Sequence, residues 1–181
     1  YTLAIYKKRE IEALAFNKTL EKLVQTKGYP ELILDLPYAD DQVIRGLLID
    51  SQKGNLLKIN RFKQVTRVQH GSETLHKSVY QNERINQSDM QRFASVDTLF
   101  SLPEAYLFTL LVDLKEKDAL QEVTFQEIYT DIRECIDLTH KDGSLKSEII
   151  KDLDRYILDD PHLSMTLDKF IENGKKLFLL T

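Results

Sequence analysis

Hydrophobic positions recur at helical spacing near the start of the chain and then give way to short β-rich runs. Over residues 8–27 apolar side chains return every three or four positions, and Gly28 followed by Pro30 supplies a stop, which predicts one amphipathic helix. Three short runs rich in β-branched and apolar residues follow at 44–50, 56–60 and 65–69, separated by turn-forming residues. They predict an antiparallel meander of three strands.

The second half of the chain has a mostly helical pattern. Residues 72–91 are polar and predict a long exposed connection or a partly helical arm, and apolar spacing then predicts helices at 90–100, 104–117, 124–140 and 146–158. A short helix around 163–172 ends at Asn173-Gly174 and precedes the apolar run 177–180. That order is typical of a helix leading into a buried parallel strand, which would place Thr181 at the carboxyl end where α/β sheets bind ligands.

Composition and charge narrow the class of protein. With 181 residues of which 42% are apolar, the chain can bury a sizeable core. Its single cysteine, Cys135, forms neither an internal disulfide nor a cysteine-rich zinc site, which fits a reducing, cytoplasmic setting. The net charge of −4 argues against a nucleic acid polymer as partner, and no apolar run approaches the ~20 residues that span a bilayer. We therefore expect a cytoplasmic protein with neither nucleic acid nor membrane as its partner.

No phosphate-binding glycine loop, zinc-type histidine spacing or nucleophile elbow occurs in the sequence. Several short blocks, in order, nevertheless resemble the cytosolic purine 5′-nucleotidase family of haloacid dehalogenase phosphohydrolases. The blocks are 1–7 (YTLAIYK), 28–30 (GYP), 45–47 (RGL), 54–58 (GNLLK), 70–71 (HG), 97–104 (DTLFSLPE) and 143–146 (GSLK). Their combination is far more specific than any single block.

The resemblance implies an α/β fold: a haloacid dehalogenase-like parallel sheet core, only partly present, with a large inserted α+β cap that contains the meander and several helices. Residues 1–10 would begin the core, 11–158 would form the cap and substrate-recognition region, and 159–181 would return to the core. The two aspartates of the first motif would directly precede Tyr1, and further motifs would follow Thr181. We therefore expect the 181-residue chain alone to be inactive, with its ends on neighbouring parallel strands.

The implied activity is magnesium-dependent hydrolysis of purine nucleoside monophosphates such as IMP and GMP, through an aspartyl-phosphate intermediate. The Mg²⁺ ligands are expected mostly outside this chain, and Thr181 would bind the transferring phosphoryl group. Without the resemblance Thr181 would be an ordinary residue at a strand end. A homo-oligomer is compatible with the sequence, which does not specify the oligomeric state.

The helix around residues 131–140 carries the predicted base-recognition residues. Arg133, Asp137 and His140 are spaced i, i+4 and i+7, so they share one stripe of the helix. The resemblance implies that Arg133 and Asp137 face the purine, where a guanidinium suits the O6 and N7 acceptors and a carboxylate suits the N1 hydrogen. From spacing alone, an exposed ion pair worth only a few tenths of a kcal/mol is the alternative.

Three further residues take a role from the resemblance. Phe100 would stack on the base and Lys146 would contact the nucleotide, the alternatives being a core phenylalanine and a solvated lysine. Asp97 stands where the family has asparagine at a regulatory nucleotide site, and the change from amide to carboxylate argues against activation by purine nucleotides. Two other functions stay open: a catalytically inactive relative that binds a nucleotide or a protein, and a free-standing helical interaction module.

Overall fold

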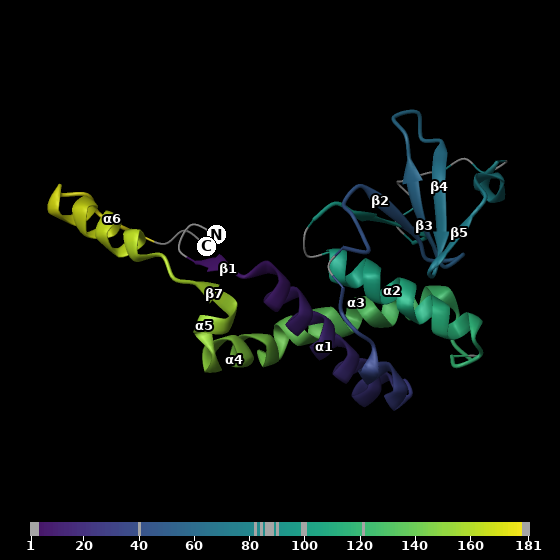
Figure 1. Cartoon of the computed structure of the whole chain (residues 1–181), viewed down its shortest axis with the longest axis horizontal. Helices are drawn as coiled ribbons and strands as arrows, with labels where there is room; N and C mark the ends of the chain where they lie inside the picture. The colour runs from purple at the N-terminus through teal and green to yellow at the C-terminus, as the bar shows by residue number, and fades with distance from the viewer. Residues whose placement is uncertain are drawn as a thin grey trace.

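A computed structural model describes residues 4–39, 41–81, 83, 85, 89, 91–98, 101–120 and 122–178. A five-stranded antiparallel sheet stands on a layer of helices, and a helical arm extends from the opposite end of the molecule (Figure 1). Both helical and strand elements are present, so the mixed α/β class predicted from the sequence is confirmed.

The helical layer consists of α1 (Lys8–Lys27), α2 (Ser101–Glu116) and α3 (Phe125–Lys141), close to three of the predicted helices. α1 ends where Gly28 adopts a left-handed conformation, and α3 begins with a capping box between Thr124 and Glu127. α1 and α3 pack with buried apolar faces against α2, which is buried on most sides because it also contacts the sheet. The main core includes Phe16, Leu20, Leu23, Phe108, Leu111, Ile128 and Ile132, all at most 1% exposed.

The sheet contains the predicted meander and two further strands. In sheet order its strands are β5 (Glu73–Leu75), β4 (Val65–His70), β3 (Asn55–Ile59), β2 (Leu47–Asp50) and β6 (Phe93–Val96). The prediction of a helix over 90–100 is wrong over β6, which pairs with β2 so that Leu47 lies opposite Val96. Phe93 and Val96 are three positions apart, which suits one helical face, but the strand turns them to opposite sides of the sheet, each of which is covered.

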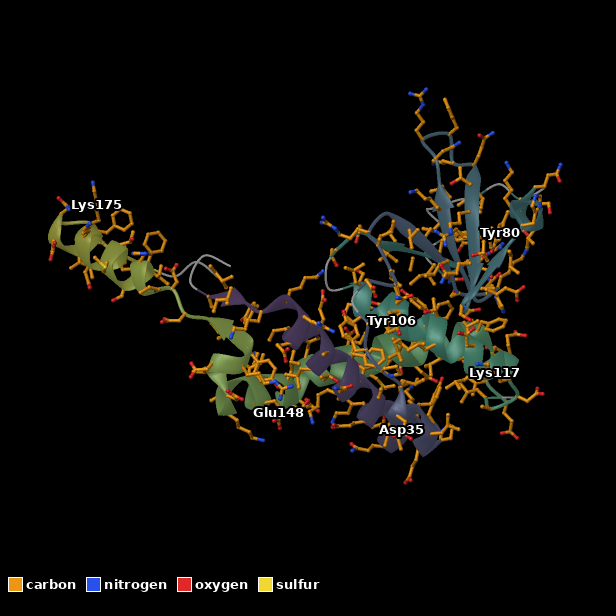
Figure 2. The ribbon with its side chains drawn as sticks, viewed as in Figure 1. Asp35, Tyr80, Tyr106, Lys117, Glu148 and Lys175 are labelled. Atoms are coloured by element: carbon orange, nitrogen blue, oxygen red, sulfur yellow. The ribbon has the colours of Figure 1, made fainter. Side chains whose placement is uncertain are left out.

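One side of the sheet packs on the helices, and the other is covered by the segment that follows β5. The segment 72–91, for which the sequence predicts a long exposed connection or a partly helical arm, is mostly exposed where the structure describes it and contains β5 and the 3₁₀ helix η2 (Lys77–Tyr80). The buried side chains of Tyr80 and Ile85 are the exception. Tyr80 points toward the sheet (Figure 2), and its hydroxyl donates to Asp50 Oδ2 at 2.7 Å. Arg92 donates to both oxygens of the fully buried Asp50 carboxylate, at 3.0 and 2.7 Å. The sequence prediction missed this cover because few of its residues are apolar.

The last part of the chain is more broken than predicted. The expected helix over 146–158 consists of α4 (Ser144–Lys151) and α5 (Leu153–Tyr156), separated at Asp152, whose side chain accepts from the Arg155 amide to begin α5. Two short strands, β1 (Ile5–Tyr6) and β7 (Ile157–Leu158), then pair antiparallel. The remaining elements are α6 (Pro161–Glu172), near the predicted 163–172, and the 3₁₀ helix η1 (Glu31–Asp35).

The parallel core stays a prediction. Every strand pair in the part of the chain that the structure describes is antiparallel. Leu177 and Phe178 of the predicted parallel strand have no regular structure and are exposed, whereas residues 1–3 and 179–181 lie outside the described ranges. The proposed division into three segments and the placement of the two ends on neighbouring strands therefore stay predictions. No helix within the described ranges is long and apolar enough to cross a membrane.

Candidate functional site

A cavity of about 270 Å³ lies between α1, α3 and the first turn of α2. Lys8 and Glu12 line it from α1, and Arg133, Asp137 and His140 line it from α3. Apolar side chains form much of the remaining wall; they include Ile11, Phe16, Leu107, Ile136 and Leu145. An apolar pocket with a few polar groups is the usual form of a small-molecule site.

Arg133 lies between two carboxylates on the α3 side of the cavity. Its Nη1 donates to Glu104 Oε2 at 2.7 Å, and its Nη2 lies 3.8 Å from Asp137 Oδ1. Desolvation lowers the pKa of Arg133, but the hydrogen bond to Glu104 and the Glu104 charge outweigh it, so the net pKa is raised. Arg133 therefore stays charged, neutralises Glu104 and keeps further N–H donors available.

Glu104 does not line the cavity itself but holds Arg133 at its wall, a role that the sequence analysis missed. It is 4% exposed and belongs to α2, where the neighbouring positions are almost all buried. Burial raises the pKa of the Tyr129 hydroxyl on α3, and the negative charge of the neighbouring Glu104 raises it further. Tyr129 is therefore a second α3 residue beside this carboxylate. The available signal was the single charged residue within the mostly apolar run 102–112, because a buried carboxylate needs a partner.

A second buried carboxylate, Glu12, lies on the opposite wall. It is 7% exposed, accepts from the Tyr38 hydroxyl at 2.9 Å and lies 3.8 Å from Lys8 Nζ. The rings of Phe16, Tyr38 and Tyr106 pack together with centroids 5.3 to 6.0 Å apart. Tyr106 belongs to α2 (Figure 2). Glu12 lies four positions before Phe16, so both residues are on the same face of α1. This spacing from a buried aromatic residue could have predicted that Glu12 is buried.

The structure places three of the predicted site residues on this one cavity. Arg133, Asp137 and His140 all line it, as their shared helical stripe requires, although their role in binding stays a prediction. Lys146 is exposed on α4, outside the lining but next to Leu145, which contributes to it. Asp97 is exposed at the end of β6.

Two predicted residues cannot be placed by geometry. Phe100 and Thr181 lie outside the described residues. Phe100 nevertheless falls in the sequence between Thr98 and Ser101, which both line the cavity. The stacking role of Phe100 and the phosphate-binding role of Thr181 therefore rest on the resemblance alone.

The described residues do not fit a magnesium site. Within the described ranges no group of three or more histidine, cysteine, aspartate or glutamate side chains could hold a metal ion. The buried carboxylates at the cavity are instead engaged by other side chains, Glu104 by Arg133 and Glu12 by Tyr38. No chemical step is therefore assigned to a metal on these residues, and the expected Mg²⁺ rests on the resemblance.

The known families and proteins that match include one family model and one relative that each cover the whole chain. A family model described as the 5′ nucleotidase family matches residues 1–181. A 5′-nucleotidase domain-containing protein of Dictyostelium discoideum is 29% identical over 189 aligned residues. That alignment covers 100% of this chain but 32% of the relative, so the chain spans about a third of the length of the relative it matches.

Proposed function

Because the chain belongs to the 5′ nucleotidase family, we propose that it recognises the base of a purine nucleoside 5′-monophosphate for a phosphohydrolase of the nucleotidase type. The observation that carries this proposal is the convergence of Arg133, Asp137 and His140 on one largely apolar cavity. An apolar wall suits a planar base, and a few polar groups at its edge suit the recognition of that base.

Arg133 and Asp137 present complementary groups to a 6-oxopurine. The bond to Glu104 restrains the guanidinium, and its remaining donors suit the O6 and N7 acceptors of hypoxanthine or guanine. Asp137 is 55% exposed and only 3.8 Å from Arg133 Nη2, so its oxygens are accessible to the N1 hydrogen of the base. Glu104, Arg133 and Asp137 together carry one net negative charge. This charge also favours a hydrogen-bond donor, such as the N1–H group of the base, at Asp137.

Adenine reverses this pattern. Its N1 is an acceptor and its 6-position carries a donor, so both would meet groups of the wrong kind at Asp137 and Arg133. An unpaired polar group in a closed site costs about 1–3 kcal/mol, or roughly five- to hundredfold in affinity. The arrangement therefore favours IMP and GMP over AMP.

The catalytic chemistry is the part of the proposal that rests on the family. Magnesium dependence, an aspartyl-phosphate intermediate and phosphate binding by Thr181 are carried over from the resemblance, whereas the described residues bear on base recognition. A cytoplasmic location and purine nucleotides as partners belong to the same proposal. The catalytically inactive alternative predicts the same nucleotide binding without phosphate release.

Calorimetric titration of the chain with IMP, GMP and AMP tests the proposal. The two 6-oxopurine nucleotides should bind more tightly than AMP, and Asp137→Asn should remove most of that preference. Glu134→Gln is the matched control, because it neutralises a carboxylate on the same helix that pairs with Lys27 instead. Equal affinity for all three nucleotides, or an unchanged preference in Asp137→Asn, would show that Asp137 is only half of a surface ion pair. Phosphate release by the full-length protein then separates a hydrolase from an inactive relative.

A further inference from the structure

The hairpin formed by β3 and β4 is strongly basic, although the chain as a whole is acidic. Residues 51–72 contain three lysines, two arginines and no acidic residue, in a chain with 29 acidic and 25 basic residues. One of the five, Lys53, pairs with Glu83 near the inner end of the hairpin. The other four are exposed, and none forms an ion pair with another described residue: Lys58, Arg61, Lys63 and Arg67.

Two of these cations face each other across the hairpin. Lys58 is directly opposite Arg67 in the strand register, so their side chains lie on the same side of the sheet. Like charges in that position repel each other. On the other side of the sheet, Ile59 and Val65 pack against the smaller hydrophobic core. A local arrangement that works against the stability of the fold without internal compensation is typical of a functional surface.

The turn that joins the two strands presents an aromatic ring to solvent. Phe62 is 68% exposed, and the Arg61 guanidinium lies 4.7 Å from the centroid of its ring. Asn60 Oδ1 accepts from the amides of Phe62 and Gln64 at 2.9 and 3.0 Å, and Lys63 adopts a left-handed conformation with φ of 61°. The turn is therefore held in one conformation while its most apolar side chain points outward.

The composition of the whole chain, with no apolar run long enough to span a bilayer, led us to expect no membrane partner, but the local charge of this hairpin points the other way. We propose that the basic hairpin, Asn55–His70, docks on an anionic membrane surface. In this arrangement Phe62 enters the bilayer interface and the four unpaired cations lie at the level of the lipid headgroups. The loop between β3 and β4 projects from the sheet, away from the helical layer (Figure 1), so the hairpin can reach a flat surface first. The acidic remainder of the molecule then stays at a distance where salt screens it.

This geometry favours a membrane over a single-stranded nucleic acid. Proteins that bind single strands line a groove with cations and set aromatic rings on a platform inside it. Here the exposed ring lies in the turn of a projecting hairpin between Arg61 and Lys63, with Lys58 and Arg67 on the strands, and Arg61 already covers one face of the ring. A convex tip with an apolar end matches the order of apolar interior and charged headgroups in a bilayer.

The expected binding is reversible and sensitive to salt. One Lys or Arg near an anionic surface strengthens binding about fivefold, so two cations account for about twenty-five-fold. A single aromatic ring adds a modest increment, comparable with other reversible interfacial anchors. Raising the salt concentration should release the protein, because exposed charges separated by more than about 10 Å are screened at 0.1 M.

A tryptophan at the tip gives a direct test, because the chain contains no tryptophan. Phe62→Trp should show a blue-shifted, brighter emission with phosphatidylserine-rich vesicles and no change with vesicles of phosphatidylcholine alone. In that background Lys58→Gln with Arg67→Gln should weaken vesicle binding about twenty-five-fold. The matched control is Lys175→Gln with Lys176→Gln, which changes the net charge equally near the far end of α6 (Figure 2) and should leave binding unchanged.

Three outcomes would overturn the inference. They are an unchanged emission with phosphatidylserine-rich vesicles at low salt, an equal loss of binding in both double variants, and quenching by a single-stranded RNA oligonucleotide without any response to vesicles. Thermal unfolding of each variant checks that its fold is intact. The measurement uses no nucleotide, so its result is independent of the proposed function.

Discussion

The pair formed by Glu104 and Arg133 should couple the stability of α2 to that of α3. A double-mutant cycle with Glu104→Gln, Arg133→Gln and the combined variant isolates their interaction energy. The same cycle with Asp137→Asn in place of Glu104→Gln supplies an internal comparison, because Arg133 contacts both carboxylates from one guanidinium.

The magnitudes follow from burial and distance. Charged hydrogen bonds contribute about 1.5–3 kcal/mol, but 46% of the Arg133 side chain is exposed, so screening reduces the expected coupling to Glu104 to about 1–2 kcal/mol. Asp137 is 55% exposed and 3.8 Å away, which predicts about 0.3–0.5 kcal/mol. Arg133→Gln should also cost more than Glu104→Gln, because it leaves the Glu104 carboxylate buried without its cation.

Urea unfolding followed by circular dichroism measures all six proteins. The slope of free energy against urea concentration should stay the same across them, so that the differences report stability and not a change in the unfolded state. A loss of 1–2 kcal/mol would also lower the melting temperature by roughly 2–8 °C. Equal coupling energies for the two pairs, or a smaller cost for Arg133→Gln than for Glu104→Gln, would refute the reasoning.

Three further predictions concern parts of the fold outside the cavity. A hydrogen bond from Lys22 lowers the pKa of Asp142 from 3.8 to about 2. The contribution of this pair to the stability of the fold should therefore be present above pH 4 and lost as the pH falls toward 2. Between pH 4 and pH 2, the free energy of unfolding of Asp142→Asn should depend less on pH than that of the wild type. Arg92→Gln removes the bidentate partner of the fully buried Asp50 and should cost about 3 kcal/mol in urea unfolding, where a loss below about 1 kcal/mol would contradict the role of this pair. Gly71→Ala should lower the melting temperature, because a methyl group at its φ of 55° is strained and would overlap a carboxylate of α2, and an unchanged melting temperature would argue against that close approach.

The sequence alone determined the elements whose pattern is local and repeated. The helices near 8–27, 104–117 and 124–140 and the three-stranded meander were predictable because apolar spacing, glycine stops and turn residues act within a few positions of one another. The shared stripe of Arg133, Asp137 and His140 followed from helix geometry in the same way. The chemistry expected of that stripe came from a resemblance spread over several blocks, since spacing alone also allowed an ion pair.

Only the tertiary structure decided which faces meet. Glu12 and Glu104 become buried because helices distant in the sequence pack over them, and residues 93–96 form a strand because β2 offers an edge to pair with. Net charge likewise averages over the chain, whereas strand pairing gathers Lys58 and Arg67 on one side of a projecting hairpin. Local periodicity sets the internal geometry of an element, but burial and clustering of charge depend on partners that lie far away along the chain.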